Sequence, residues 1–310
     1  MNNTLVKIIS AKPFLKWAGG KSQIIADLEI RLPDHIRKSR VIKNYVEPFI
    51  GGGAFFFYLS SQYEIQKSTI LDINPELYIA YNVIKLKPYE LIDELNKCEN
   101  NFLSLDNQNR ETFYYDIRSK YNSQLKEFNF NLLNNDCIER TAQLIFLNKT
   151  CFNGLFRQNK KGEFNVPYGD YKKPSICNMN NIMECSKTLV NTVILQGDFS
   201  KSSLYIDNDT LVYLDPPYRP INKTASFTSY SKDGFNDDDQ IRLAEFYKEM
   251  SKKGAYLLLS NSDPQNENPN DTFFGKIYNC FTIDKVFANR MINCNGNRRG
   301  KITELLIFNY

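Results

Sequence analysis

The first 75 residues alternate between strand-like and helix-like stretches, and this alternation restricts the possible folds more than any other feature. The apolar stretch "NYVEPF" leads through three glycines into the helical run "AFFFYL", and "KSTILDIN" follows as a second strand ending on an acid. Strands separated by helices line up in parallel, with the helices covering the sheet. We therefore expect an α/β fold built on a parallel sheet.

The alternation stops near residue 77 and resumes near 177. The intervening residues are rich in Asn, Lys and Tyr, and their patterns are helical, as in "RTAQLIFLNKTCF". Strand patterns return in "NTVILQGDF", "TLVYLDPPY" and "AYLLLSNS", and the C-terminal stretch predicts a hairpin. We expect an α/β domain, 1–76 and 177–310, interrupted by a mostly helical insertion, 77–176.

Two helices of the α/β domain can be read from apolar spacing. The segment "KPFLKWAGGKSQIIADLEIRLP" predicts a turn at its glycines and then a helix with Ile24, Ile25 and Leu28 on one face. The segment "NDDDQIRLAEFYKEMSKKG" has acids at its start and glycine at its end, as helices prefer. Its spacing places Ile241, Ala244 and Tyr247 on one face.

Composition excludes several classes of protein. Apolar residues make up 42% of the 310 residues, enough for a large core, yet no apolar run approaches the ~20 residues of a membrane helix. The N-terminus lacks the cationic head and cleavage site of a signal peptide. We therefore expect a soluble, cytoplasmic protein without a membrane partner.

Cysteine and histidine usage restricts the chemistry. The seven cysteines include no C-x-x-C pair, so we expect reduced thiols and no metal site. The single histidine, His35, lies in a polar stretch that predicts a solvated loop. Catalysis by Ser–His or Cys–His pairs is therefore excluded.

Positive charge is unevenly distributed. The net charge is only +4, but lysines and arginines gather at 157–173 and 290–301, while acids gather at 233–239. This distribution favours a polyanionic partner, although basic clusters also form ordinary solvated faces.

The tetrapeptide "DPPY", 215–218, follows an apolar strand. Pro216 has no N–H and must end the strand, and the prolines hold their carbonyls in set directions. The Asp215 carboxylate and a proline carbonyl so held form two acceptors suited to one amino group, and Tyr218 offers a flat face for the ring bearing it. A rigid turn with a capping Asp explains D-P alone but not the whole tetrapeptide.

Three further stretches suit a nucleoside-type cofactor. The glycines of "EPFIGGGAF" let backbone approach a ligand beyond a strand end, and Asp72 lies ~20 residues on, where a carboxylate can bind ribose hydroxyls. The sole tryptophan, Trp17, lies beside glycines and Lys21. Each stretch also has a purely structural interpretation. Packing alone would account for the glycine turn and for a buried Trp17, and Asp72 could simply cap a turn at the end of its strand. Nicotinamide and P-loop motifs are absent from the sequence.

In order, and over nearly the whole chain, these segments resemble DNA adenine-N6 methyltransferases of the Dam type (D12 class, alpha group). The matching stretches are "PFLKWAGGK", "EPFIGGGA", "LDIN", "CFNGLFRQNKKGEFNVPYGDYKKP", "GDF", "DPPY", "ASFTSYSKDGF" and "RRGKITELL". The resemblance implies a Rossmann-like class I methyltransferase domain with an inserted target-recognition domain. It also implies S-adenosyl-L-methionine as methyl donor, S-adenosyl-L-homocysteine as product, and no metal.

The resemblance also assigns residues. Asp215, Pro216 and Tyr218 form the catalytic site, where adenine N6 is methylated after the base has flipped out of the duplex and stacked on Tyr218. The implied cofactor contacts are Trp17, Ala18, Gly19, Lys21, Glu47, Phe49, Gly51, Gly53, Asp72, Asp198, Phe199 and Asp215. Residues 225–230 are expected to line the pocket or fill the gap left in the duplex.

The implied partner is double-stranded DNA. Asn153, Leu155, Arg157 and Pro167 match the family's base-reading positions, and Arg157 can bond bidentately to guanine, although alone it could equally contact phosphate. The resemblance predicts GATC as the target. Phosphate contacts are expected from Lys160, Lys161, Lys172, Lys173, Arg298, Arg299 and Lys301.

Other interpretations remain at this point. Related sites methylate RNA adenine or protein glutamine, although the glutamine enzymes favour Asn where this chain has Asp215. Another GAT-containing target is possible, and a DNA-binding regulator without turnover would be expected to lose Asp215 or the glycine loop. We expect a monomer, which could act beside a cognate restriction endonuclease without forming a stable complex.

Overall fold

The computed structural model describes residues 10–17, 19–21, 23–219, 235–289 and 301–310. The chain divides into two compact units. The helical unit comprises residues 1–20, 51–61 and 75–192, and the sheet unit comprises 21–50, 62–74 and 193–310.

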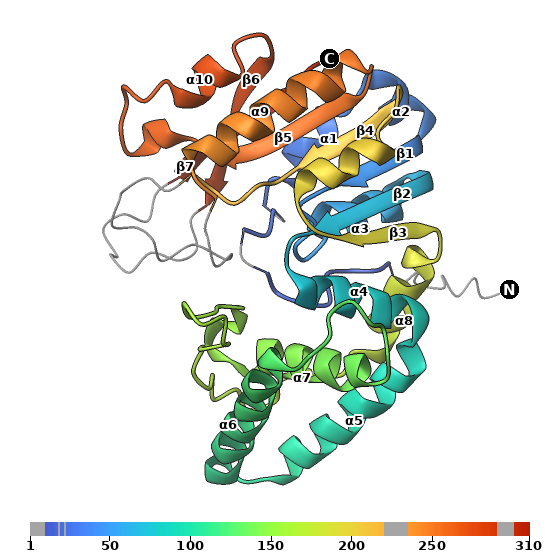
Figure 1. Cartoon of the computed structure of the whole chain (residues 1–310), viewed down its shortest axis with the longest axis vertical. Helices are drawn as coiled ribbons and strands as arrows, with labels where there is room; N and C mark the ends of the chain where they lie inside the picture. The colour runs from blue at the N-terminus through green and yellow to red at the C-terminus, as the bar shows by residue number, and fades with distance from the viewer. Residues whose placement is uncertain (1–9, 18, 22, 220–234, 290–300) are drawn as a thin grey trace, which may run out of the picture. The chain divides into compact units, whose positions relative to one another are not determined.

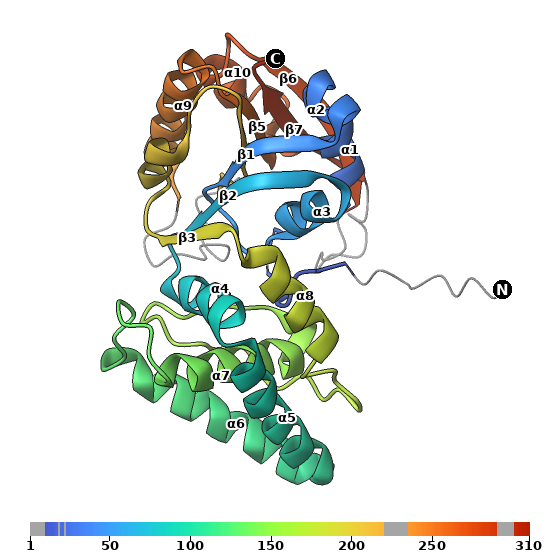
Figure 2. The ribbon, with the colours of Figure 1, turned by 90° about the vertical axis from the view of Figure 1, so that its right-hand side faces the viewer.

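The sheet unit is built on a seven-stranded sheet with the order β3-β2-β1-β4-β5-β7-β6. Figure 2 shows β3, β2 and β1 side by side in this sheet. Strand β1 is parallel to β2 and β4, and β4 is parallel to β5, whereas β7 is antiparallel to both β5 and β6. The strands are β1 (Val41–Glu47), β2 (Glu64–Asp72), β3 (Thr192–Gln196), β4 (Thr210–Leu214), β5 (Tyr256–Ser262), β6 (Thr282–Asn289) and β7 (Lys301–Phe308). The expected α/β fold and C-terminal hairpin are confirmed.

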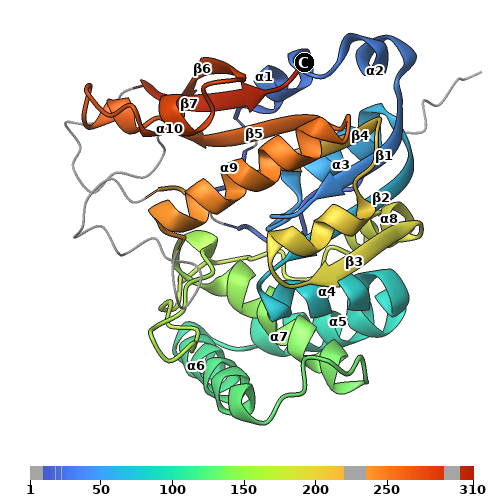
Figure 3. The ribbon, with the colours of Figure 1, turned by 45° about the horizontal axis from the view of Figure 1, so that its top comes forward.

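Helix α9 (Asp237–Lys252) covers part of this sheet (Figure 3). Its buried residues join the core formed with β1, β4, β5 and β7. The other helices of the unit are α1 (Ile25–Ile30), α2 (Asp34–Ser39) and α10 (Phe273–Ile277). His35 is exposed as expected but lies in α2 rather than in a loop.

The face of α9 differs from the expected one. Ile241 is 40% exposed, whereas Gln240 is fully buried, at 0% exposure. Gln240, Leu243, Ala244 and Tyr247 are spaced three and four residues apart, so they share the face turned to the core, and Ile241 lies at its edge. A polar side chain has therefore taken a core position that the apolar pattern did not assign.

The helical unit has α7 (Asp136–Thr150) at its centre, in contact with α4, α5 and α6 (Figure 1). The remaining helices are α3 (Ala54–Gln62), α4 (Pro75–Leu86), α5 (Pro88–Ser104), α6 (Asn107–Ser123) and α8 (Met179–Leu189). Within the described ranges, no helix is both long and apolar enough to cross a membrane.

A buried ion pair joins two of these helices. Arg140 of α7 is 1% exposed and donates from Nε to both carboxylate oxygens of Glu76 of α4, at 2.9 and 3.1 Å. Its Nη1 donates to the Tyr121 carbonyl at 3.1 Å, and the rings of Tyr121, Phe128 and Phe130 surround the guanidinium. Burial raises the pKa of Glu76, and Arg140 opposes that shift.

We expect Arg140→Met to lower the free energy of unfolding by about 3–5 kcal/mol, because it leaves the Glu76 carboxylate buried without its cation. The double variant Glu76→Gln/Arg140→Met should recover part of this loss. Urea unfolding measures both. Lys120→Met is the control, since it removes an exposed ion pair between α6 and α7 and should cost less than ~1 kcal/mol. Equal losses of unfolding free energy in Arg140→Met and Lys120→Met would contradict the prediction.

Candidate active site

Several acidic side chains meet at one edge of the sheet unit. Glu47 ends β1, Asp72 ends β2, and Asp215 directly follows β4. Since these strands are parallel, their carboxyl ends share an edge, and the strand order reverses between β1 and β4. In open α/β sheets, ligands bind in the crevice at such a reversal.

Lys21 brings the predicted catalytic residues together. Its ammonium group lies 2.9 Å from Oδ1 of Asp215, donates to the hydroxyl of Tyr218 and lies 3.7 Å from Oε2 of Glu304. The Tyr218 hydroxyl in turn donates to Oε1 of Glu304 at 3.0 Å. Ser260 of β5 donates to Oδ1 of Asp215 at 3.1 Å. We call Lys21, Asp215, Tyr218 and Glu304 the lysine cluster.

Lys21 and Glu304 of the lysine cluster are buried, Asp215 and Tyr218 are half-buried, and the charges of the cluster are coupled. Lys21 is 4% exposed; burial alone would lower its pKa, but Asp215, Tyr218 and Glu304 outweigh that effect and leave the pKa raised. Burial raises the pKa of Asp215, Lys21 opposes the shift, and Glu304 adds to it. With all three charged groups ionised, two carboxylates share one ammonium, so the cluster favours a further cation.

Glu304 was not among the predicted site residues. It lies on β7, and because β7 is antiparallel to β5, its first half lies at the edge where β4 and β5 end. Glu304 pairs with Ser262, two residues beyond the Ser260 that contacts Asp215. The only signal in the sequence was a carboxylate inside the apolar strand "KITELLIF".

Asp198 and Phe199 follow β3 and lie beside Phe49. Phe199 is buried, and its ring centroid lies 5.5 Å from that of Phe49. Both Asp198 oxygens accept hydrogen bonds from Arg242, at 2.8 and 2.9 Å. Burial alone would raise the pKa of Asp198, but the bonds from Arg242 and Ser200 outweigh it and lower the pKa to about 2. Asp198 therefore stays ionised, and Arg242 is a second contact that sequence reasoning missed.

Asp72 and Glu47 are held by local bonds. The Asp72 side chain accepts from the Asn74 amide at 2.9 Å, and its carbonyl accepts from the Gly197 amide at 3.0 Å. The ends of β2 and β3 are thereby joined. Glu47 is buried and accepts from the Tyr45 hydroxyl at 2.7 Å, so it contributes a fixed charge at the end of β1.

The other predicted cofactor residues lie in the helical unit. Gly51 and Gly53 have φ values of +47° and +71°, where glycine is favoured. The Gly51 carbonyl accepts from the Tyr81 hydroxyl at 3.1 Å, and a Cβ at Gly53 would lie 2.6 Å from that hydroxyl. Trp17 stacks on Phe156 with ring centroids 4.7 Å apart. Gly19 also has a positive φ, +78°.

The predicted base-reading residues share one loop of the helical unit, 151–169. Two isolated bridges, Cys151 with Tyr168 and Gln158 with Phe164, draw its strands together. Asn153, Arg157 and Pro167 are exposed, and Leu155 is half-buried. Lys160, Lys161, Lys172 and Lys173 are exposed as well.

Asn148 holds this loop, and sequence reasoning did not identify it. It is buried at the end of α7; its Oδ1 accepts from the Lys16 amide, and its Nδ2 donates to the carbonyls of Lys16 and Gly154, all within 3.1 Å. One side chain therefore joins the segment before Trp17 to the start of the loop.

Some predictions fall outside the described residues. These are Ala18, Arg298, Arg299 and the segment 225–230, together with the side chain of Lys301.

Comparison with known proteins identifies the family. Residues 17–292 match the D12 class N6 adenine-specific DNA methyltransferases. The chain belongs to this family. Among its relatives is the type II methyltransferase M.MjaIII of Methanocaldococcus jannaschii, 52% identical over 97% of this chain and 100% of the relative. The type II methyltransferase M1.LlaDCHI of Lactococcus lactis subsp. cremoris is 36% identical over 97% and 96%.

A third relative is the DNA adenine methylase of Vibrio cholerae serotype O1, 34% identical over 95% of each chain. Membership of the D12 class confirms the predicted enzyme class, N6 methylation of adenine in DNA. The family implies S-adenosylmethionine as methyl donor and double-stranded DNA as substrate. RNA adenine and protein glutamine are not substrates that its description names.

The lysine cluster makes a prediction about stability. In Lys21→Met, Asp215 loses its cation, so its folded-state pKa rises further above the unfolded value. A raised folded pKa gives stability that is present at low pH and lost as pH rises through that pKa. The Tm difference from the parent should therefore be larger at pH 8 than at pH 5; each further pKa unit, about 1.4 kcal/mol, would widen it by about 3–5 °C.

Thermal unfolding at the two pH values measures this difference. Lys43→Met, which removes the exposed pair with Asp209, is the matched control and should show no such widening. A Tm difference for Lys21→Met that is the same at pH 5 and pH 8 would contradict the coupling.

Proposed function

We propose that this D12-class enzyme transfers a methyl group from S-adenosylmethionine to N6 of adenine in GATC sites, at a site formed by Asp215, Pro216 and Tyr218. The lysine cluster at the end of β4 is the observation that carries this proposal. It combines a half-buried carboxylate, a held phenol ring and an excess of negative charge directly after the strand.

Adenine N6 is a poor nucleophile because its lone pair is delocalised into the ring. Hydrogen bonds from its two hydrogens to Asp215 and to the Pro216 carbonyl favour a tetrahedral nitrogen and free that lone pair. Among the described residues, both contacts of Asp215 fall on Oδ1, and the Pro216 carbonyl accepts no hydrogen bond. Oδ2 and this carbonyl are therefore the acceptors assigned to the amine.

The cofactor supplies an activated methyl group on a sulfonium, and the residues present suit such a cation. Two carboxylates, Asp215 and Glu304, share the one ammonium of Lys21. We propose that Asp72 binds the ribose and that Phe49, Asp198 and Phe199 lie against the adenine of the cofactor. Trp17, Gly19, Gly51 and Gly53 of the helical unit and Glu47 remain predicted contacts. Alignment of the reacting atoms is the main contribution, and such effects reach ~7–11 kcal/mol.

A base inside a duplex cannot reach this site, so the target adenine must flip out at a cost of a few kcal/mol. Tyr218 provides the ring for it to stack on. The Tyr218 hydroxyl is held by Lys21 and Glu304, so the ring is placed before the base arrives. Preorganisation of this kind reduces the entropy lost on binding.

The GATC target is proposed from the loop 151–169 and its resemblance to Dam-type enzymes. Among the described residues, the Arg157 side chain bonds only through Nε, to Oδ1 of Asn165 at 2.9 Å. Both terminal nitrogens are left for the O6 and N7 of guanine. The Vibrio cholerae relative is named a DNA adenine methylase, which agrees with adenine as the methylated base. A different GAT-containing site is the alternative.

We further propose that the enzyme acts as a monomer and that a restriction endonuclease for the same site accompanies it. Two relatives are named type II methyltransferases, which supports the second point. The exposed lysines 160, 161, 172 and 173 supply phosphate contacts, so binding weakens as salt rises.

The variant Asp215→Ala tests the catalytic proposal. We expect Asp215→Ala to lower kcat by at least about 100-fold, the scale on which loss of a transition-state hydrogen bond is felt. The measurement is radiolabel transfer from S-adenosylmethionine to plasmid lacking N6-methyladenine. Asp209→Ala, which removes a half-buried aspartate of the same unit, is the control. Parent-like transfer by Asp215→Ala would end the proposal.

Arg157 decides the target proposal. In a host without its own adenine methylation, the parent enzyme should place N6-methyladenine at GATC. Arg157→Ala should relax discrimination at the guanine by about 1–3 kcal/mol. Lys161→Ala, a predicted phosphate contact, should weaken methylation of all sites alike. Methylation mapped to another sequence would replace GATC as the target.

A further inference from the structure

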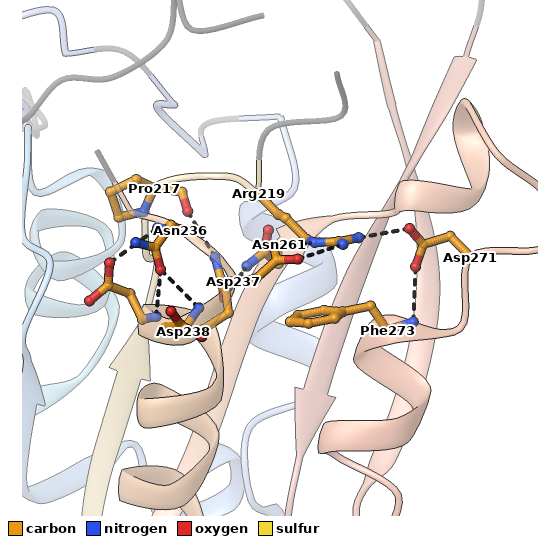
Figure 4. Close-up of polar contacts among 10 residues, drawn as sticks. Pro217, Arg219, Asn236, Asp237, Asp238, Asn261, Asp271 and Phe273 are labelled. Carbon is orange, nitrogen blue, oxygen red and sulfur yellow. Dashed lines mark hydrogen bonds and ion pairs between the residues drawn. The ribbon is translucent and has the colours of Figure 1, made fainter. Parts of the chain in front are cut away.

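A buried amide relay supports the DPPY segment from behind. Nε2 of Gln240 donates to the carbonyl of Pro217 at 3.1 Å, and Oε1 of Gln240 accepts from Nδ2 of Asn261 at 3.3 Å. Gln240 and Asn261 are both fully buried, and they come from α9 and β5. Figure 4 labels Pro217 and Asn261, the residues at the two ends of this relay.

Proline chemistry explains what this relay can control. The rings of Pro216 and Pro217 fix the φ angles of those two residues. Asp215 and Pro216 each precede a proline, which restricts their ψ angles to extended values. Between the Cα atoms of Asp215 and Tyr218, ψ of Pro217 is the only φ or ψ angle that the prolines leave unrestrained. That torsion sets both the direction of the Pro217 carbonyl and the position of Tyr218.

Gln240 therefore holds the one carbonyl whose direction the prolines do not determine. Pro217 is half-buried, and a hydrogen bond of this kind contributes about 0.5–1.5 kcal/mol, so the bond resists rotation of the carbonyl. Asn261 keeps the Gln240 amide in the orientation in which its nitrogen faces Pro217. The Oδ1 of Asn261 is itself held, because it accepts from the Ser262 amide at 2.9 Å.

The chain is also held on the other side of Tyr218. Arg219 donates to both oxygens of Asp237, at 2.6 and 2.8 Å, and to Asp271 at 2.7 Å, and its guanidinium lies 4.1 Å above the Phe273 ring (Figure 4). Asp237 begins α9, the helix that carries Gln240. Tyr218 thus lies between two attachments to α9. Gln240 holds the Pro217 carbonyl before it, and Asp237 holds the Arg219 side chain after it.

We propose that Gln240 is a positioning residue for methyl transfer, because its bond to the Pro217 carbonyl fixes the last free torsion before Tyr218 and so places the ring on which the target adenine stacks. Asn261 acts through Gln240 by fixing its amide. This inference rests on the proposed roles of Asp215 and Tyr218. Neither Gln240 nor Asn261 touches the reacting atoms.

The test is Gln240→Met, which keeps the length of the side chain and removes its donor. A displacement of about 1 Å at a reacting centre can cost 10²-fold, so kcat should fall by about 10–100-fold. The KM for S-adenosylmethionine should stay that of the parent, because Lys21, Asp72 and Asp198 are held by other contacts. Steady-state methylation of plasmid lacking N6-methyladenine separates kcat from KM, at temperatures where thermal unfolding shows each variant folded.

Asn261→Asp tests the relay without changing its size. The new carboxylate still accepts from the Ser262 amide but cannot donate to Gln240, so the Gln240 amide turns its oxygen towards Pro217. We expect kcat to fall, and the double variant to be no worse than Gln240→Met alone, because both changes break the same connection. This variant also decides the matter if Gln240→Met does not fold.

Asn309→Leu is the matched control. Asn309 also donates from its side-chain amide to a backbone carbonyl, that of Ala255, at 2.9 Å and at the opposite end of β5, and the kcat of this variant should be that of the parent. The proposal is overturned if Gln240→Met keeps the parent kcat, or if its KM for S-adenosylmethionine rises as kcat falls. It is also overturned if the losses of kcat in Gln240→Met and Asn261→Asp add up in the double variant. Failure of the catalytic proposal is seen separately, as activity retained by Asp215→Ala.

Discussion

One buried ammonium group connects the parts of the sheet edge on which the chemistry depends. Lys21 precedes the first helix of the sheet unit, Asp215 follows β4, and Glu304 comes from β7. Without Lys21, two carboxylates would face each other away from water, which is costly unless both are paired or hydrogen-bonded. The ammonium of Lys21 offsets only one of the two negative charges, because Asp215 and Glu304 share it. We propose that the remaining negative charge suits this edge of the sheet to a cationic methyl donor.

The two units use buried charge differently. In the helical unit, Arg140 and Glu76 form a matched pair enclosed by aromatic rings, and every strong contact of the guanidinium is internal. That arrangement joins α4 to α7, and the two opposite charges cancel. In the sheet unit, the lysine cluster has one carboxylate more than it has cations. We interpret the neutral Arg140–Glu76 pair as structural and the unbalanced lysine cluster as a ligand-binding site.

The DPPY segment gains its rigidity from two sources. Proline rings restrict most of the torsions between Asp215 and Tyr218, and the Gln240 amide restrains the remaining one. Arg219 attaches the chain again immediately after Tyr218. Rigid acceptors lose little entropy when an amine arrives, so the segment is suited to alignment rather than to adjustment. A buried glutamine on an otherwise apolar helix face is explained by this need.

Local patterns were enough to predict the α/β class, the strand ends at Asp72 and Asp215, and the C-terminal hairpin, because alternation and strand-ending residues act over a few positions. The helix face of α9 was predicted less well, since a buried amide leaves no apolar signal. The partnership of Lys21 with Glu304 joins residues 283 positions apart. It depends on β7 entering the sheet antiparallel to β5, which no local pattern encodes. The sequence by itself determined which groups could do the chemistry; only the tertiary structure decided which of them meet, because strand order and direction set that distance.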